Sequence, residues 1–139
     1  MSRRTKIAGV LLILLVQLAC HSGSKKSSDG KAQSASELPV MKFDSLSADF
    51  GEVKEGEKVV LFYTFENVGG DNLVIYEALP SCGCTTPKYD DSPVKPGEKR
   101  TVEVVFDSEG WSGLQQKSIT FKTNGLPDYT TITLTGTVN

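Results

Sequence analysis

Two cysteines separated by one glycine are the residues of this chain best suited to chemistry. Cys82 and Cys84 flank Gly83 within the string Pro80-Ser-Cys-Gly-Cys-Thr-Thr-Pro87. In an extended strand, residues i and i+2 lie about 6.6 Å apart, near the upper limit for a disulfide, but glycine can adopt a turn that brings them closer. Three interpretations are open: a redox-active disulfide, two thiolates that bind Cu(I) or zinc, and two small apolar side chains that pack where a strand becomes a loop.

The metal interpretation needs ligands from outside the domain. The only histidine is His21, near the N-terminus, and Met41 is the only methionine besides the initiator. Two thiolates alone do not complete a zinc or copper site, so a partner or a second copy would have to supply the rest. The same lack of histidine leaves Ser81, Ser108 and Ser112 without a general base, which excludes a hydrolase triad of the usual kind. We therefore expect no enzymatic activity, and Cu(I) is the one cofactor left open.

The N-terminus has the pattern of a bacterial lipoprotein signal. Arg3, Arg4 and Lys6 precede an apolar run over residues 7–18, which is too short for a membrane span of about 20 residues. The sequence Gln17-Leu-Ala-Cys20 follows and is similar to a lipobox. Cleavage there would remove a signal peptide of residues 1–19 and leave Cys20 as the new N-terminus, carrying lipid chains such as palmitate. An ordinary cleaved signal with a leftover cysteine is the alternative.

Residues 20–38 have the composition of a flexible tether. Between His21 and Leu38 the chain is rich in Ser, Lys and Gly and has no apolar residue larger than alanine. Such a segment cannot bury enough surface to order itself, and about 18 residues of this kind reach roughly 24 Å. We therefore expect a folded domain over residues 39–139, lipid-anchored to a membrane of the bacterial cell envelope and facing the periplasm or the cell surface.

The charge balance excludes one class of partner. The chain has 139 residues with 15 basic and 17 acidic side chains. Loss of residues 1–19 would leave 12 basic against 17 acidic side chains, a net charge of −5. An acidic domain is not suited to bind phosphates, so we expect no nucleic acid and no nucleotide as partner.

Alternation of apolar and polar residues predicts an all-β domain. Strands are expected over residues 58–67, 73–79, 99–107, 114–123 and 131–138. Tyr63 and Phe65 belong to the core in this pattern, and Gly136 lies on an inward face, where it indicates a bulge or the close approach of a neighbouring strand. No segment has a helical apolar stripe, so the pattern favours an immunoglobulin-like antiparallel β-sandwich of about seven strands.

Two further features attract functional hypotheses. Residues 80–97 are predicted to form a long loop, and Asp90-Asp91 within it precede Ser-Pro, which is typical of a turn rather than of paired catalytic carboxylates. Trp111 lies between Gly110 and Gly113. It is a candidate partner surface, and the alternative is that it covers the open end of the core.

Several motifs in order make a family resemblance specific. They are Tyr63-Thr-Phe-Glu-Asn-Val-Gly69, Ser81-Cys-Gly-Cys-Thr-Thr-Pro87, Val94-Lys-Pro-Gly-Glu98 and Leu134-Thr-Gly-Thr-Val138. The chain resembles the bacterial Hydin-like, immunoglobulin-like domain of unknown function (family 1573), often found singly on lipoproteins of Gram-negative bacteria. The resemblance implies a small β-sandwich at the cell envelope. It implies no activity.

Two functional hypotheses follow from the residues. The first is a lipid-anchored, non-enzymatic domain that binds an unknown envelope protein or glycan. The second is a thiol-redox or copper-handling accessory protein that acts through Cys82 and Cys84 in an oxidising compartment.

Overall fold

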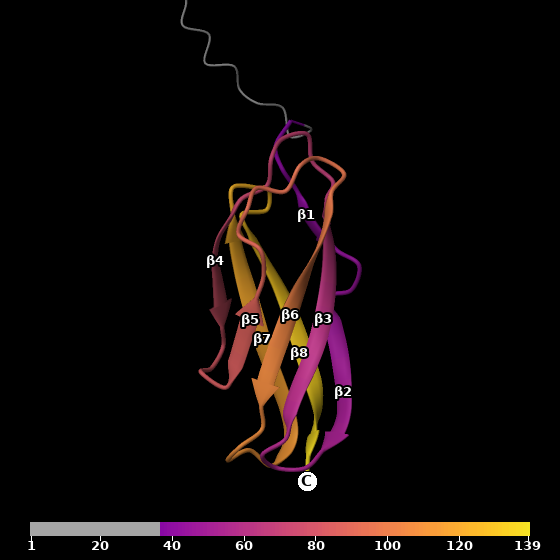
Figure 1. Ribbon diagram of the computed structural model, residues 1–139, viewed down its shortest axis with the longest axis vertical. Coiled ribbons are helices and arrows are strands. Elements are labelled where there is room, and N and C mark those ends of the chain that lie inside the picture. The colour runs from indigo at the N-terminus through magenta and orange to yellow at the C-terminus, as the bar shows by residue number, and fades with distance from the viewer. Residues whose placement is uncertain (1–36) are drawn as a thin grey trace, which may run out of the picture. The chain divides into compact units, whose positions relative to one another are not determined.

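Within residues 37–139, eight strands form two four-stranded sheets that pack face to face (Figure 1). The computed structural model describes residues 37–139, so the signal peptide, Cys20 and almost all of the tether lie outside the described residues. The strands are β1 (Met41–Phe43), β2 (Ser47–Val53), β3 (Lys58–Asn67), β4 (Ile75–Pro80), β5 (Thr85–Lys88), β6 (Lys99–Asp107), β7 (Gly113–Thr123) and β8 (Tyr129–Val138). One sheet has the order β1-β3-β6-β5 and the other the order β2-β8-β7-β4. No helix in the described part of the chain is long and apolar enough to cross a membrane.

The core lies between the sheets and is built by the alternating residues of the long strands. On β3, β6, β7 and β8 alternate side chains point inward. Most of them are almost completely buried, and Val59 and Leu61 of β3 are partly buried against the core. The predicted core positions Tyr63 and Phe65 are 3% and 1% exposed, which confirms their assignment. The sandwich expected from the sequence is therefore confirmed, with eight strands.

The first strand segment changes sheets and closes one side of the sandwich. β1 pairs antiparallel with β3, whereas β2 pairs parallel with β8, although the sequence analysis expected only antiparallel pairs. The connection between β1 and β2 has only three residues, so the chain keeps its direction as it crosses from one sheet to the other. β3 and β8 run in opposite directions, so a segment that is antiparallel to β3 is parallel to β8. The register of β2 shifts between Asp49 and Glu52, where the Phe50 ring lies 5.5 Å from that of Phe106.

On the opposite side the chain crosses between sheets a second time. β4 leaves one sheet at Pro80, and β5 joins the other at Thr85. The predicted loop over residues 80–97 is thus wrong in part, because residues 85–88 form an edge strand against β6. A strand of four residues that contains Pro87 is too short and too poor in apolar residues to be visible from alternation.

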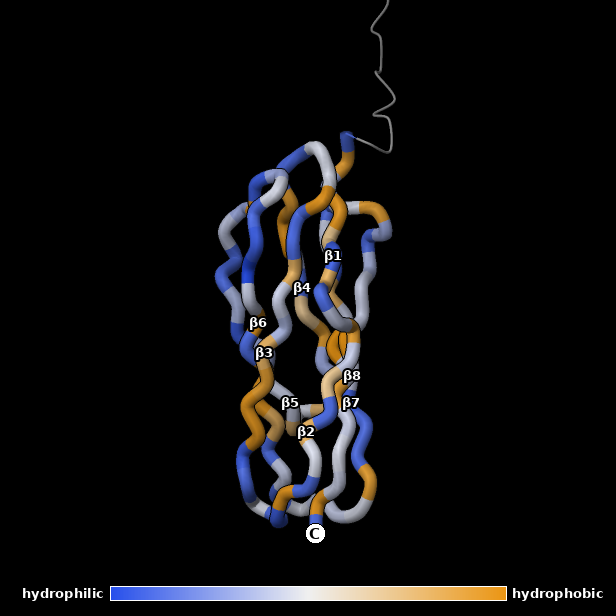
Figure 2. Tube along the Cα trace, turned by 90° about the vertical axis from the view of Figure 1, so that its right-hand side faces the viewer, coloured by the Kyte–Doolittle hydropathy of each residue, from blue (hydrophilic) through white to orange (hydrophobic). Residues whose placement is uncertain are grey.

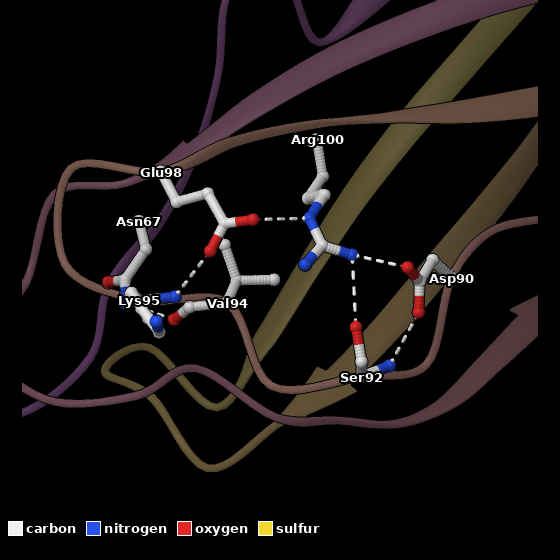
Figure 3. A network of polar contacts seen from close by, with 7 residues as sticks. All are labelled: Asn67, Asp90, Ser92, Val94, Lys95, Glu98 and Arg100. Atoms are coloured by element: carbon white, nitrogen blue, oxygen red, sulfur yellow. Dashed lines mark hydrogen bonds and ion pairs between the residues drawn. The ribbon is translucent and has the colours of Figure 1, made fainter.

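Asn67 ties together the loops at the end of the sandwich where the described chain begins (Figure 3). Its side-chain nitrogen donates hydrogen bonds to the carbonyls of Asp71 and Val94, at 2.8 and 2.9 Å. Its side-chain oxygen accepts from the N–H groups of Val40 and Gly69, at 3.2 and 3.1 Å. Every hydrogen-bonding position of this buried amide is therefore used.

Arg100 holds the loop between β5 and β6 beside this amide. Its guanidinium donates to Glu98 at 2.7 Å and to Asp90 at 2.6 Å (Figure 3). Asp90 also accepts a hydrogen bond from the N–H of Ser92, and this bond, with the Ser92 hydroxyl and Arg100, lowers the pKa of Asp90 from its ordinary value. The prediction that Asp90 is a turn residue is confirmed.

Gly136 is a point of close contact between β8 and β2. A Cβ atom at this position would lie 2.3 Å from the Phe50 ring and 2.7 Å from the carbonyl oxygen of Gly51. The close approach expected from a glycine on the inward face is confirmed, and the bulged part of β2 is the neighbour responsible.

We predict that Gly136→Ala destabilises the domain by about 1–3 kcal/mol, because the added methyl group overlaps both a ring and a backbone oxygen. Gly83→Ala is the matched control. An added Cβ at position 83 meets nothing within 4 Å, so its effect should stay within about 0.5 kcal/mol. Urea denaturation followed by circular dichroism measures both. Equal effects of the two substitutions would contradict the packing assigned to Gly136.

Candidate functional site

The two cysteines of the Ser-Cys-Gly-Cys-Thr string are joined to each other. Cys82 and Cys84 form a disulfide, with a Cα–Cα distance of 5.3 Å, in the corner where the chain crosses from β4 to β5. Gly83 lies in the turn between the two cysteines without a positive φ, and an added Cβ atom there would meet nothing within 4 Å. In this state no thiolate is free, so binding of Cu(I) at the pair would first require reduction.

The two sulfur atoms have different surroundings. Both cysteines are partly exposed, but Cys84 packs against the hydrophobic core. The hydroxyl of the buried Thr85 lies 3.5 Å from the Cys82 sulfur and 3.8 Å from the Cys84 sulfur. The corner thus offers one sulfur held by the core, one sulfur away from it, and one hydroxyl that can donate a hydrogen bond to either.

The backbone on both sides of the disulfide is held by strand pairing. The N–H of Ser81 donates to the carbonyl of Ser118 at 2.8 Å, which extends the pairing of β4 with β7. The N–H of Asp107 donates to the carbonyl of Cys84 at 2.9 Å, which extends the pairing of β5 with β6. These hydrogen bonds fix the ends of the corner without any contribution from the sulfur–sulfur bond.

Lys117 is a buried cation that the sequence analysis did not single out. It occupies an inward position of β7 and is 7% exposed. Its ammonium lies 3.2 Å from the centre of the Trp111 ring and 5.8 Å from that of Phe106. Burial lowers the pKa of this amine from its ordinary value. Lys117 is two residues before the buried Ile119, so strict alternation along the strand places Lys117 on the inward face as well. The alternation could therefore have identified Lys117 as a buried residue.

Trp111 covers the end of the core beside Lys117. It is partly buried and packs against the hydrophobic core, and its backbone N–H donates to the carbonyl of Ser108. The Lys117 ammonium occupies part of the ring surface through a cation–π contact. The role of Trp111 as a partner surface stays a prediction, and its packing gives it a structural role as well.

The outer face of the β1-β3-β6-β5 sheet carries exposed apolar side chains that the sequence analysis did not select. Val60 is 47% exposed and Phe62 is 65% exposed, and both project from β3 on the side opposite to Tyr63. Val105 of β6 is the cross-strand neighbour of Val60 and is partly exposed. The hydrophobic stretch of β3 is visible in Figure 2. We call Val60, Phe62 and Val105 the β3 patch.

Polar side chains around the β3 patch are paired with one another across the strands. Lys58 forms an ion pair with Asp107 at 3.1 Å, and Lys88 forms one with Glu103 at 3.0 Å. The hydroxyl groups of Thr64 and Thr101 lie 3.3 Å apart. This face therefore has an apolar centre, and its polar edge is already satisfied within the domain.

A shallow hollow lies on the other sheet, at the edge formed by β2 and β8. Its volume is about 290 Å³, and its lining consists of Asp49, Gly51, Glu52, Leu114, Thr135, Gly136 and Thr137. Within residues 37–139 no three His, Cys, Asp or Glu side chains are placed to hold a metal ion together.

A protein-family model matches most of the chain. Residues 41–138 match the model of a family described as a protein of unknown function, DUF1573. The chain belongs to this family. The match contains every strand and the cysteine corner, whereas Cys20 lies outside the matched residues. A search of curated proteins found no match.

Solved structures show the same fold in different settings. The chain is similar to a protein of unknown function from Porphyromonas gingivalis W83, with a TM-score of 0.65 and 22% identity over 76% of this chain and 50% of that chain. It is also similar to the ASH or PapD-like domain 7 of human CEP192, with a TM-score of 0.58 and 12% identity over 77% of this chain and 89% of that one.

A third similar structure is the VesB protease of Vibrio cholerae, with a TM-score of 0.54 and 16% identity over 73% of this chain and 32% of that chain. The chain thus spans half of the Porphyromonas protein and about a third of the protease. At these identities the likenesses show an immunoglobulin-like, PapD-like fold and nothing about activity.

We predict that replacing both Cys82 and Cys84 by Ser leaves the domain folded, with a loss of less than about 3 kcal/mol from a typical margin of about 5–15 kcal/mol. A bridge between residues two apart closes a far shorter loop than the 15 residues for which chain entropy contributes about 3 kcal/mol. Thermal melts of the oxidised, reduced and doubly substituted proteins measure this. Unfolding of the wild type by reduction alone would show that the pair is a structural clasp.

Proposed function

We propose that this protein is a non-enzymatic binding module, held at a membrane of the bacterial cell envelope by lipid on Cys20, that docks another envelope protein through the β3 patch. One observation carries the proposal: Phe62 is 65% exposed on the outer face of a sheet, and its polar neighbours are satisfied by one another.

The chemistry of the β3 patch suits a protein partner. Protein interfaces have an apolar centre, enriched in aromatic residues, surrounded by a polar rim. Covering Phe62 and Val60 would remove apolar surface from water, which contributes about 25 cal/mol per Å². The Lys88–Glu103 pair beside Phe62 is already formed, so a partner need not supply a counter-charge for either group.

A protein partner is favoured over a glycan because of the position of Trp111. Sugar rings stack on open aromatic faces, but the Trp111 ring packs against the core and has the Lys117 ammonium 3.2 Å from its centre. Phe62 offers an open ring on a flat strand face, which is suited to the side chains of a protein.

The proposed attachment is supported by the way the chain enters the domain. The carbonyls of Leu38, Pro39 and Val40 accept hydrogen bonds from the N–H groups of Gly70, Leu126 and Val68, respectively. The backbone is thus fixed to two loops from Leu38 onward. This position coincides with the end of the tether predicted from composition.

Site-specific photo-crosslinking in the native envelope tests the docking surface. A benzoylphenylalanine at position 62 should crosslink to a discrete envelope protein, whereas the same group at position 114 should not. Leu114 is the matched control, because it is an apolar residue, 82% exposed, on the other sheet. Phe62→Ser should abolish copurification of the crosslinked protein and leave the thermal melt unchanged. Crosslinks from position 114 alone, or none from either, would refute the β3 patch as the docking surface.

Membrane attachment is tested separately. Cys20→Ser should move the protein from the membrane fraction to the soluble periplasmic fraction, because two or more acyl chains on one residue make attachment stable and the variant carries none. Fractionation with an immunoblot measures the distribution. A variant that stays with the membrane would refute the lipid anchor.

A second candidate function is thiol redox chemistry at Cys82 and Cys84. The disulfide in the corner between β4 and β5 is the observation that favours it. Copper handling at the same pair is the weaker form of this candidate, since the sulfur atoms would have to be reduced before they could bind Cu(I).

A further inference from the structure

We infer that the Cys82–Cys84 disulfide is a thiol-exchange site, at which the domain accepts two electrons from the paired thiols of another protein through attack on the Cys82 sulfur. The inference develops the second candidate function and does not depend on docking at the β3 patch. It rests on the position of the disulfide, on the unequal surroundings of its sulfur atoms and on the support of the corner by strand pairing.

The disulfide links residues that the backbone already holds. It joins positions two apart and connects neither the two sheets nor two distant segments. Ser81 is hydrogen-bonded to Ser118 on one side, and Cys84 is hydrogen-bonded to Asp107 on the other. Opening the sulfur–sulfur bond therefore leaves β4 and β5 in their sheets. A disulfide that can open and close without unfolding is suited to reversible exchange.

The surroundings indicate which sulfur is attacked. Cys84 packs against the hydrophobic core and Cys82 does not, so an incoming thiolate meets the Cys82 sulfur with fewer obstructing atoms. Cys84 is then the leaving group. The Thr85 hydroxyl lies 3.8 Å from the Cys84 sulfur and 3.5 Å from the Cys82 sulfur, so it can donate a hydrogen bond to the thiolate that forms in either step of the exchange.

The exchange balances in two steps. A thiolate of the donor forms a bond with the Cys82 sulfur, the Cys82–Cys84 bond breaks, and its electron pair goes to the Cys84 sulfur, which takes up a proton. The second thiolate of the donor then attacks the donor sulfur of this mixed disulfide, and the Cys82 sulfur leaves with the electron pair and is protonated. The donor dithiol is oxidised to a disulfide, and the Cys82–Cys84 pair is reduced to two thiols.

A titration with glutathione redox buffers tests reversible exchange. The full chain carrying Cys20→Ser has Cys82 and Cys84 as its only thiols. Alkylation and mass spectrometry count the free thiols, and circular dichroism follows the fold. We expect both thiols to appear together as the buffer becomes reducing and to disappear when the buffer is made oxidising. The circular dichroism spectrum should stay constant throughout. A disulfide that is reduced only after denaturation, or thiols that never pair, would overturn the inference.

Two single substitutions test the direction of attack. In the Cys20→Ser background, Cys84→Ser leaves the Cys82 thiol free, and Cys82→Ser leaves the Cys84 thiol free. With oxidised glutathione as the probe, the Cys82 thiol should form the mixed disulfide several times faster than the Cys84 thiol, because Cys84 packs against the core. Equal rates, or a faster Cys84, would overturn the assignment of Cys82 as the attacked sulfur.

Phe62→Ser serves as the control that separates the two proposals. It removes the centre of the β3 patch and leaves the disulfide corner intact, so the glutathione titration of this variant should coincide with that of the parent protein. A shifted titration would show that the two sites are coupled and would overturn their independence.

Discussion

The side-chain amide of Asn67 makes four hydrogen bonds to backbone groups, and it is completely buried while doing so. Its partners come from the entry of the chain at Val40, from the β3–β4 turn at Gly69 and Asp71, and from the β5–β6 connection at Val94. An amide has no further hydrogen-bonding capacity, and each of these backbone groups left unpaired would cost about 1–3 kcal/mol. One side chain therefore fixes where three distant segments meet.

The neighbouring ion pairs extend this constraint to the whole end of the sandwich. Arg100 connects Glu98 and Asp90, and Glu98 also accepts a hydrogen bond from the N–H of Lys95 (Figure 3). Hydrogen bonds and the Arg100 charge lower the pKa of Asp90 and of Glu98, so both carboxylates stay charged at neutral pH. The polar side chains at this end of the domain hold its loops in place. The cysteine corner lies outside these contacts. The β3 patch lies on the same two strands as Asn67 and Arg100, but on residues that none of these hydrogen bonds involves.

The fold by itself does not select a function. Similar sandwiches occur in chains as different as the Vibrio cholerae protease and a domain of human CEP192, at 16% and 12% identity. Function therefore has to reside in side chains that the sandwich does not need for its own stability. Phe62 and Cys82 meet this condition. Phe62 adds exposed apolar surface to an otherwise satisfied face, and Cys82 does not pack against the core.

The sequence by itself determined the long strands, because apolar alternation is a local property. The bounds of β3 and β6 were predicted at Lys58–Asn67 and Lys99–Asp107, and those of β7 differ by one residue. The same alternation separated Tyr63 and Phe65 from Val60 and Phe62 on β3. Short segments escaped this signal. β1, β2 and β5 are defined by the strands they join, and β5 contains only four residues.

Only the tertiary structure decided how the faces and corners are used. Alternation showed that Gly136 points inward, but the Phe50 ring that requires a glycine there comes from β2, more than 80 residues away. The Cys-Gly-Cys string left three interpretations open, and the crossing from β4 to β5 brought the sulfur atoms together. Phe62 lies on the face of β3 opposite to Tyr63 and Phe65. Whether anything covers that face depends on distant segments. Within residues 37–139 nothing does so fully, and Phe62 is 65% exposed. Local pattern sets which way a side chain points, whereas burial is set by contacts between segments far apart in the sequence.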